Sequence, residues 1–328
     1  MKDRFENNVH VRGWVFDFQL TKRTTSANAK TPNVNFITGT VYVAVDKDAI
    51  NVVPVAFGFF NTQEHYKNGK ENETYKNLLE MMEPANEGRT VKNSGIDNAM
   101  QVRIDGRITT NDFMTRSGEM ASPKQLSGTF LHFVRPNEEL VPCAEFSADA
   151  LIQSAAMREG SSGDEYMELK GFVFDFGGRI YPVTLSVPGE AGQQFFESQE
   201  VSTSNPYFGK VWGVVNTSVQ KIEREVDTSN VGFGEVPEVE YSTRTLRTWD
   251  VEGANINLGL SDDTITMDEL KVSMDYRQKN LTYIRERWEE QNNSGAQSQG
   301  FGASSPVVPA SKVATKKKAA TDDDDFEF

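Results

Sequence analysis

The sequence is poor in the residues that disulfides and metal sites need. Cys143 is the only cysteine among 328 residues, which excludes an intramolecular disulfide and is typical of a reducing compartment. The three histidines, His10, His65 and His132, show no paired spacing with one another or with Cys143. We therefore expect no structural metal, and we interpret Cys143 as a small, buried or half-buried thiol.

Long apolar runs are also missing. No stretch approaches the length that crosses a bilayer, and the opening MKDRFENNVH lacks the apolar segment of a secretory signal. These absences predict a soluble protein that stays in the cytoplasm and has no membrane partner.

Signatures of catalysis are absent as well. The chain contains no GxxxxGK(S/T) phosphate loop, no HExxH and no GxSxG, and no carboxylates gather around a basic residue with catalytic spacing. The plentiful acidic residues are more typical of a solvated surface. We therefore expect a protein that is not an enzyme and that needs no cofactor.

The acidic charge balance excludes a protein that binds nucleic acid through an overall basic surface. The formal net charge is −14 at pH 7, and residues 301–328 hold four lysines and five acidic residues, so most of the acidity belongs to the rest of the chain. Binding of DNA then requires a local basic surface on an acidic body, because phosphate binding depends on the local field.

The chain begins with a pattern of three strands, a helix and two further strands. Residues rich in β-branched and aromatic types alternate in five segments, and one segment between the third and fourth has helical composition. The expected strands are 9–20, 35–46, 50–60, 100–113 and 125–135, and the expected helix is 71–82. This order is that of the OB-fold, a small β-barrel that binds oligonucleotides.

A second copy of the pattern follows in the same order. Pro54-Val55 corresponds to Pro182-Val183, each near the middle of an expected third strand, and Gly106 corresponds to Gly213. This register makes 144–157 the first strand of the second copy and 239–250 its fifth. A competing register pairs VRGWVFDF (11–18) with LKGFVFDF (169–176), and it stays open because short β-rich strings match by composition alone.

The chain changes character after residue 252. Residues 266–290 have a helical apolar pattern, and the composition from Gln291 onward cannot bury enough surface to fold. We predict a mainly β protein with two tandem OB-type β-barrels, a C-terminal helix and a disordered acidic tail. The expected boundaries are 1–140 for the first barrel, 141–258 for the second, 259–290 for the helix, and 291–328 for the linker and acidic tip.

Basic and aromatic residues interleave on several expected strands, as single-strand binding requires. Aromatic faces stack on bases, while lysine and arginine follow the phosphates. In the first strand, alternation places Val9, Val11 and Val15 in the core and the residues between them outside. The candidate DNA-binding residues of the first half are Arg12, Trp14, Phe16, Tyr42, Arg103 and Arg107 on strands, with Lys22, Arg23 and Lys30 in the loop between the first two strands.

The second half offers a similar set. The alternation places Lys210 and Trp212 on one face, opposite Val211 and Val215. The candidate DNA-binding residues here are Lys170, Phe172, Lys210, Trp212, Arg247 and Trp249. For every aromatic in both sets the alternative is a place in the barrel core.

The end of the chain, TKKKAATDDDDFEF, is the most specific local signal. Four consecutive aspartates precede two phenylalanines at the extreme end, which a merely solubilising tail does not need. This tip resembles the acidic, aromatic-ended C-termini of bacterial and bacteriophage single-stranded DNA-binding proteins. The resemblance covers residues 322–328 and ends in Phe-Glu-Phe where the bacterial proteins have Pro-Phe, so together with two barrels it favours a phage lineage.

That resemblance implies how the tip is used. In the family the tip docks on polymerases, helicases or recombination proteins and competes with DNA for the protein's own basic groove. The implied partner-binding residues are Asp322, Asp323, Asp324, Asp325, Phe326, Glu327 and Phe328. The helix 266–290 leaves self-association open.

The sequence thus favours a sequence-independent single-stranded DNA-binding protein of replication, recombination or repair, in the host cytoplasm if a phage encodes it. Two other classes stay open. One is a phage structural or assembly protein of β-barrel or sandwich domains with no nucleic-acid binding. The other is a replication accessory factor that binds only protein.

Overall fold

The fold begins with a closed barrel of five strands. The computed structural model describes residues 5–135, 137–160, 163–225 and 239–294. β1 pairs with β2, β2 with β3, β3 in parallel with β7, β7 with β4, and β4 again with β1, so the circuit closes. The strands are β1 (Asn7–Thr24), β2 (Asn35–Ala44), β3 (Val52–Phe57), β4 (Gln101–Thr110) and β7 (Lys124–Phe133).

Short helices connect β3 to β4. Asn72 caps the N-terminus of α1, because its side chain accepts a hydrogen bond from the backbone N–H of Thr74. The apolar face of α1 packs on β7 and buries Tyr75, Leu78 and Met81. The connecting elements are α1 (Glu73–Met81), α2 (Pro84–Glu87), α3 (Val91–Ser94) and the 3-10 turn η1 (Ile96–Asn98), and a small hairpin of β5 (Phe113–Met114) and β6 (Met120–Ala121) precedes β7.

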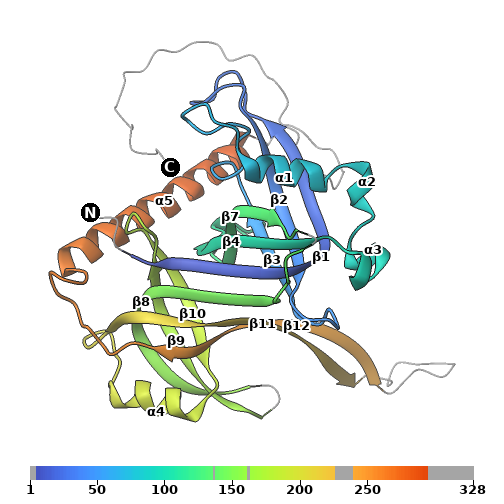
Figure 1. The fold of residues 1–328 in the computed structure, drawn as a ribbon. Helices are drawn as coiled ribbons and strands as arrows, with labels where there is room; N and C mark the ends of the chain where they lie inside the picture. Colours follow the sequence, from blue (N-terminus) through green and yellow to red (C-terminus); the bar gives the residue numbers. More distant parts are fainter. Residues whose placement is uncertain (1–4, 136, 161–162, 226–238, 295–328) are drawn as a thin grey trace, which may run out of the picture.

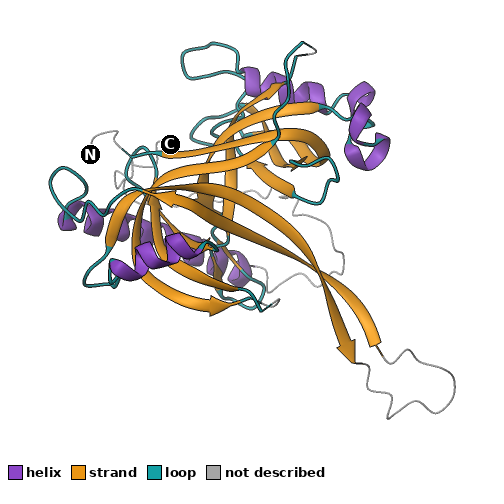
Figure 2. Ribbon diagram, turned by 60° about the horizontal axis from the view of Figure 1, so that its bottom comes forward, coloured by secondary structure: helices purple, strands orange, loops and turns teal. Residues whose placement is uncertain are grey.

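The second half repeats the order of pairings. β8 pairs with β9, β9 with β10, β10 in parallel with β12 at Ser186 and Asp250, β12 with β11, and β11 with β8. The elements are β8 (Cys143–Glu159), β9 (Glu165–Phe174), β10 (Ile180–Val187), α4 (Glu190–Ser198), β11 (Tyr207–Glu225) and β12 (Val239–Ala254). Figure 2 shows β11 and β12 extending together as a long ribbon away from the body.

The two halves form one continuous sheet. Residues Asn7 to Arg12 of β1 pair with Ala148 to Cys143 of β8, so the first strands of the two halves lie side by side (Figure 1). One buried apolar cluster contains residues of both halves, including Val11 and Phe146. The junction between the halves is therefore a packed interface.

A single helix, α5 (Met267–Ser294), crosses from the second half to the first (Figure 1). At its start, Leu270 packs in a second apolar cluster with Phe174, and Ser273 donates a 2.7 Å hydrogen bond to the carbonyl of Gly178. Further along, Arg277 forms an ion pair with Asp112, and the Trp288 ring lies beside Gly118 in the β5–β6 turn. The helix contacts both halves.

The corresponding glycines lie at corresponding irregularities. The β4–β7 register shifts between Asp105 and Gly106, and the β11–β12 register shifts between Trp212 and Gly213. A Cβ at Gly106 would lie 2.3 Å from the carbonyl oxygen of Ser127, and one at Gly213 would lie 1.9 Å from that of Asp250. Only glycine permits such an approach of two backbones.

The mainly β class, the closed five-strand barrel and the C-terminal helix are confirmed. The register that pairs Pro54-Val55 with Pro182-Val183 needs strands at 144–157 and 239–250, and the structure has a strand in each range. Residues 169–174 belong to β9, which is the second strand of the second half and not its first. No expected element corresponded to α2, α3, α4, the 3-10 turn or the β5–β6 hairpin. The predicted tail lies outside the described residues, and within the described part no helix is long and apolar enough to span a membrane.

Candidate nucleic-acid interface

A groove of about 320 Å³ lies between the two halves. We call it the junction groove, and its functional side chains are Tyr42, Lys124, Arg247 and Trp249. Tyr42 lies opposite Pro54 on the outer face of β2 and β3, because Val41 and Val43 on the alternate positions point into the core.

Hydrogen bonds hold the second half against this wall of the groove. The side chain of Asn51 donates to the carbonyl of Val215 at 3.2 Å and accepts from the backbone N–H of Thr217 at 2.9 Å. The Thr217 hydroxyl donates to the carbonyl of Val52 at 3.1 Å. Arg247 in turn donates from Nε to that hydroxyl at 3.4 Å, so its position is tied to the junction.

Lys124, the first residue of β7, supplies a half-buried cation to the groove. Its Nζ lies 5.0 Å from the centroid of the Trp249 ring and donates to the carbonyl of Thr184 in β10. Burial lowers the pKa of Lys124 from 10.5 to about 8, against the opposing attraction of Asp250 and Glu168. The ammonium therefore loses its charge as the pH rises through about 8.

Arg247 carries a charge that does not titrate in this range. Burial lowers the pKa of Arg247, and the neighbouring Tyr42 acts in the opposite direction, but a guanidinium stays protonated in proteins. Two cations beside an outward-facing tyrosine can hold phosphates while a base lies on the ring.

Trp249 is buried, so its expected exposure was wrong. Its side chain is 3% exposed and packs on Phe146, with ring centroids 5.7 Å apart. Phe146 belongs to β8 of the same half, and the ring also lies beside Lys124 of the first half. Trp249 forms the floor of the groove and positions Lys124.

Trp14 is likewise buried, at 9% exposure, which corrects its expected outward position. α3 packs against β1. A register shift in the β1–β2 pairing between Val15 and Asp17 also interrupts the alternation, and it leaves Phe16 half-buried. Arg12 is exposed, as expected.

The basic residues near the first loop are exposed, but two of them lie on a strand. β1 continues to Thr24, so Lys22 and Arg23 pair with residues of β2, and only Lys30 lies in the connecting loop. The ammonium of Lys22 is 5.9 Å from the centroid of the Tyr75 ring.

The two arginines of β4 have different surroundings. Arg103 forms an ion pair with Glu138. Arg107 is half-buried near Tyr181 of the second half, and its Nε has no hydrogen-bond partner among the described residues. These contacts place neither arginine in the junction groove.

The remaining candidates of the second half are dispersed. Lys170 is exposed and pairs with Glu168 at 2.9 Å, and Phe172 is half-buried against the second apolar cluster. Lys210 pairs with Glu6 at 2.7 Å. Trp212 is 38% exposed and lies against Gly253, outside the junction groove.

The structure thus brings Tyr42 of β2 together with Arg247 and Trp249 of β12, which are far from it in sequence, and adds Lys124. Sequence reasoning missed Lys124 because it stands at the very start of its strand, before the alternating residues begin. Lys124 pairs with Thr110 at one end of the β4–β7 ladder, and no pattern within its own strand indicates that place. Among the described residues, no three of His, Cys, Asp and Glu gather in a way that could hold a metal ion.

The fold and the groove define a mainly β protein with a closed five-strand barrel and a cationic, aromatic groove between its halves. The chain belongs to the YorF family, whose family model matches residues 6–287. No curated protein matches the chain.

Solved structures with a similar fold were also found. One is a deletion mutant, with a further point substitution, of the single-stranded DNA binding protein from Thermus aquaticus. The two chains are 9% identical, the match covers 78% of this chain and 96% of the other, and the TM-score is 0.45.

Proposed function

We propose that the protein binds single-stranded DNA without strong sequence preference, in a replication, recombination or repair system of a bacteriophage. In this proposal the protein is not an enzyme, acts in the host cytoplasm, and contains two OB-type barrels, at 1–140 and 141–258. The order of strand pairings in both circuits supports the assignment of OB-type barrels. OB-folds bind oligonucleotides on the face of their second and third strands, which favours DNA binding there.

The observation that carries the proposal is the junction groove. It lies on the outer face of β2 and β3, and it combines Tyr42 with the cations Lys124 and Arg247. Stacking on an aromatic ring tolerates any base, and cations beside the ring neutralise phosphates, so the arrangement suits an unpaired strand. It is also the local basic surface that the net charge of −14 requires.

Titration with oligo(dT) of graded length, at several salt concentrations, tests the proposal. We expect affinity to fall linearly with salt on logarithmic axes, with a slope of about −0.7 per neutralised phosphate. Duplex of the same length should bind much more weakly, because its base faces are already stacked. Equal affinity for both forms, or no affinity for either, would refute the proposal.

The pKa of Lys124 predicts a pH dependence of binding. Below about 8 the ammonium is charged and attracts phosphate, so the affinity for oligo(dT) should decrease as the pH rises through this value. Stability changes with pH in the opposite direction. Below the folded pKa of about 8 the buried charge destabilises the fold, and as the pH rises from about 8 toward the ordinary 10.5 this cost is relieved and the free energy of unfolding increases.

Affinity measured at constant ionic strength across this pH range checks the prediction. Lys124→Met removes the titrating group and should flatten the profile, while Arg89→Met, outside the groove, should leave it unchanged. A profile that is the same in wild type and Lys124→Met would show that Lys124 does not contact the strand.

The proposal includes recruitment of a polymerase, helicase or recombinase through the C-terminal tip. Asp322 to Asp325 form a dense negative charge on a tether, so they can compete with phosphate for the protein's own cations at high effective concentration. Removal of residues 321–328 should therefore strengthen binding of oligo(dT) at low salt, and the gain should shrink as salt screens the competition.

Phe328→Ala separates the two roles of the tip. The variant keeps every charge, so the affinity for DNA should hardly change, while binding to the partner protein should fall because an apolar anchor is lost. Pull-down with the replication proteins of the same genome measures the second effect. Truncation that changes neither property would mean that the tip is only a solubilising end.

A further inference from the structure

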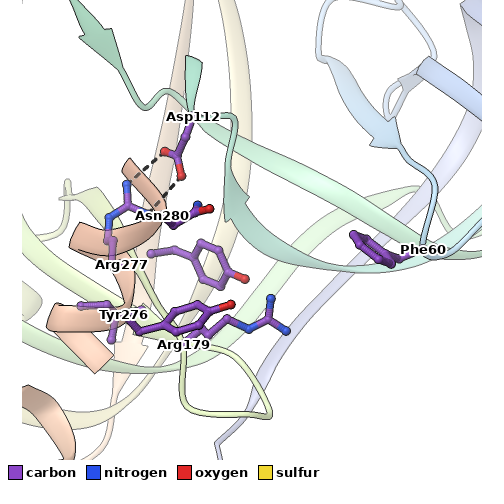
Figure 3. Close-up of a pocket in the computed structure, with 8 residues that line it drawn as sticks. Phe60, Asp112, Arg179, Tyr276, Arg277 and Asn280 are labelled. Carbon is purple, nitrogen blue, oxygen red and sulfur yellow. Dashed lines mark hydrogen bonds and ion pairs between the residues drawn. The ribbon is translucent and has the colours of Figure 1, made fainter. Parts of the chain in front are cut away.

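A second cleft, of about 220 Å³, lies where three parts of the chain meet. Phe60 comes from the segment after β3, Arg179 and Tyr181 from the start of the β10 region, and Tyr276 from α5. In Figure 3 the side chains of Tyr276 and Arg179 lie side by side and extend toward the side of the cleft on which Phe60 lies. We call it the helix cleft.

The guanidinium of Arg179 is held at the cleft by a buried carboxylate. The side chain of Asp175, 2% exposed, pairs with Arg179 Nε at 3.1 Å. The same carboxylate accepts from the backbone N–H groups of Gly177 at 3.0 Å and Arg179 at 2.8 Å, which fixes the turn before β10. The cation therefore has a defined position while a quarter of its side chain remains exposed.

The aromatic walls are suited to stacking. Phe60 is 60% exposed, and its ring contacts that of the half-buried Phe59. Tyr181 is mostly buried, which raises the pKa of its hydroxyl to about 12 despite the opposing charges of Arg179 and Arg107. The site thus offers neutral aromatic surface beside the partly exposed guanidinium of Arg179. The Asp112 carboxylate, which also lines the cleft, is paired with Arg277.

The volume limits the ligand. Pockets for drug-sized molecules hold about 300–1,000 Å³, so a cleft of about 220 Å³ accepts one planar ring system with a phosphate at its mouth. An aromatic surface beside an arginine is the combination that binds a base and its phosphate.

The helix cleft and the junction groove lie near each other on the fold. Lys124 in the groove donates to the carbonyl of Thr184, and Tyr181 of the cleft is on the same strand, about 10 Å away at the rise of a β-strand. We propose that the helix cleft is a second subsite for the same single strand, which takes one unpaired nucleotide beyond those in the junction groove. This inference rests on the proposed function, and it gives α5 a role in binding.

The test compares oligo(dT) of graded length on Tyr276→Ala, Phe60→Ala and the wild type. Short oligonucleotides that fill only the junction groove should bind all three proteins equally. For longer ones, both variants should lose the affinity gained by occupying the cleft, about fivefold or more for one lost stacking contact. Tyr283→Ala is the matched control, since Tyr283 is a half-exposed tyrosine two turns later on α5 that does not line the cleft.

Two further variants keep the result interpretable. Tyr276→Phe retains the ring and should bind like the wild type, which assigns the loss in Tyr276→Ala to the ring and not to the hydroxyl. Phe60→Ala changes an exposed side chain, so it reports on the cleft even if Tyr276→Ala does not fold.

The outcomes distinguish the two proposals. If Tyr276→Ala and Phe60→Ala bind every length as the wild type does, the subsite is refuted and the proposed function stands. If the wild type binds no oligonucleotide, the proposed function fails and the subsite fails with it. If the variants leave DNA binding intact but abolish the effect of removing residues 321–328, the cleft accepts an acidic peptide and the nucleotide assignment is wrong.

Discussion

Tyr42→Ala should lower the affinity for long oligo(dT) by about tenfold to a hundredfold, because a base loses its stacking surface. Arg247→Gln should also lower the affinity for oligo(dT), and it should reduce the salt slope by about 0.7, since one phosphate contact no longer releases its counterion. Both side chains line the junction groove, so the two effects should appear in the same titration.

Matched controls separate this effect from a general loss of charge or aromatic surface. Tyr66 is 42% exposed in the segment after β3, and Arg89 lies between α2 and α3, and neither lines the groove. Tyr66→Ala and Arg89→Gln should bind like the wild type. Equal losses in the control and groove variants would show that the groove is not the binding surface.

Arg277→Ala should lower the free energy of unfolding by about 3–5 kcal/mol, because it leaves the Asp112 carboxylate buried without its cation. The side chains of the pair are 13% and 9% exposed, and Nη2 lies 3.0 Å from Oδ1. The same guanidinium donates to the hydroxyls of Thr110 and Ser122, each at 3.3 Å, so it fixes α5 to the first half.

Urea denaturation measures this loss. Arg285→Ala is the control, because Arg285 is an exposed arginine on the same helix, and its replacement should change stability by no more than about 0.5 kcal/mol. Arg277→Ala combined with Asp112→Ala should cost less than the sum of the single changes, since no unpaired charge remains. An unchanged urea midpoint in Arg277→Ala would contradict this account of α5.

Alternation along the strands predicted the barrel core well. Val9, Val11 and Val15 are buried, as are Val102, Ile104 and Ile108 in β4, because the core side of a strand depends only on its own sequence. The outer side depends on what covers it. Trp14 lies on β1, against which α3 packs, and Trp249 packs on Phe146 and lies beside Lys124. No pattern within either strand indicates such contacts.

The grouping of the candidate site could not be predicted for the same reason. Tyr42 and Arg247 were each identified on a strand, but their shared groove exists because the two halves pack together, as at the Asn51–Thr217 hydrogen bond. Lys124 and Tyr276 reach their sites through contacts between distant elements, with Thr184 and with the β10 region. The β5–β6 hairpin and α4 were missed because two-residue strands and a helix with an internal glycine give a weak periodic signal.

Photochemical crosslinking of the full chain to a bromodeoxyuridine-substituted single strand, followed by peptide mapping, tests the central claim most directly. A base that stacks in the junction groove lies against Tyr42, so we predict a crosslink to the β2 peptide that contains it. Tyr42→Ala should abolish that crosslink, and an excess of oligo(dT), but not of duplex, should compete with it. Crosslinks that avoid β2, β7 and β12 would contradict the account.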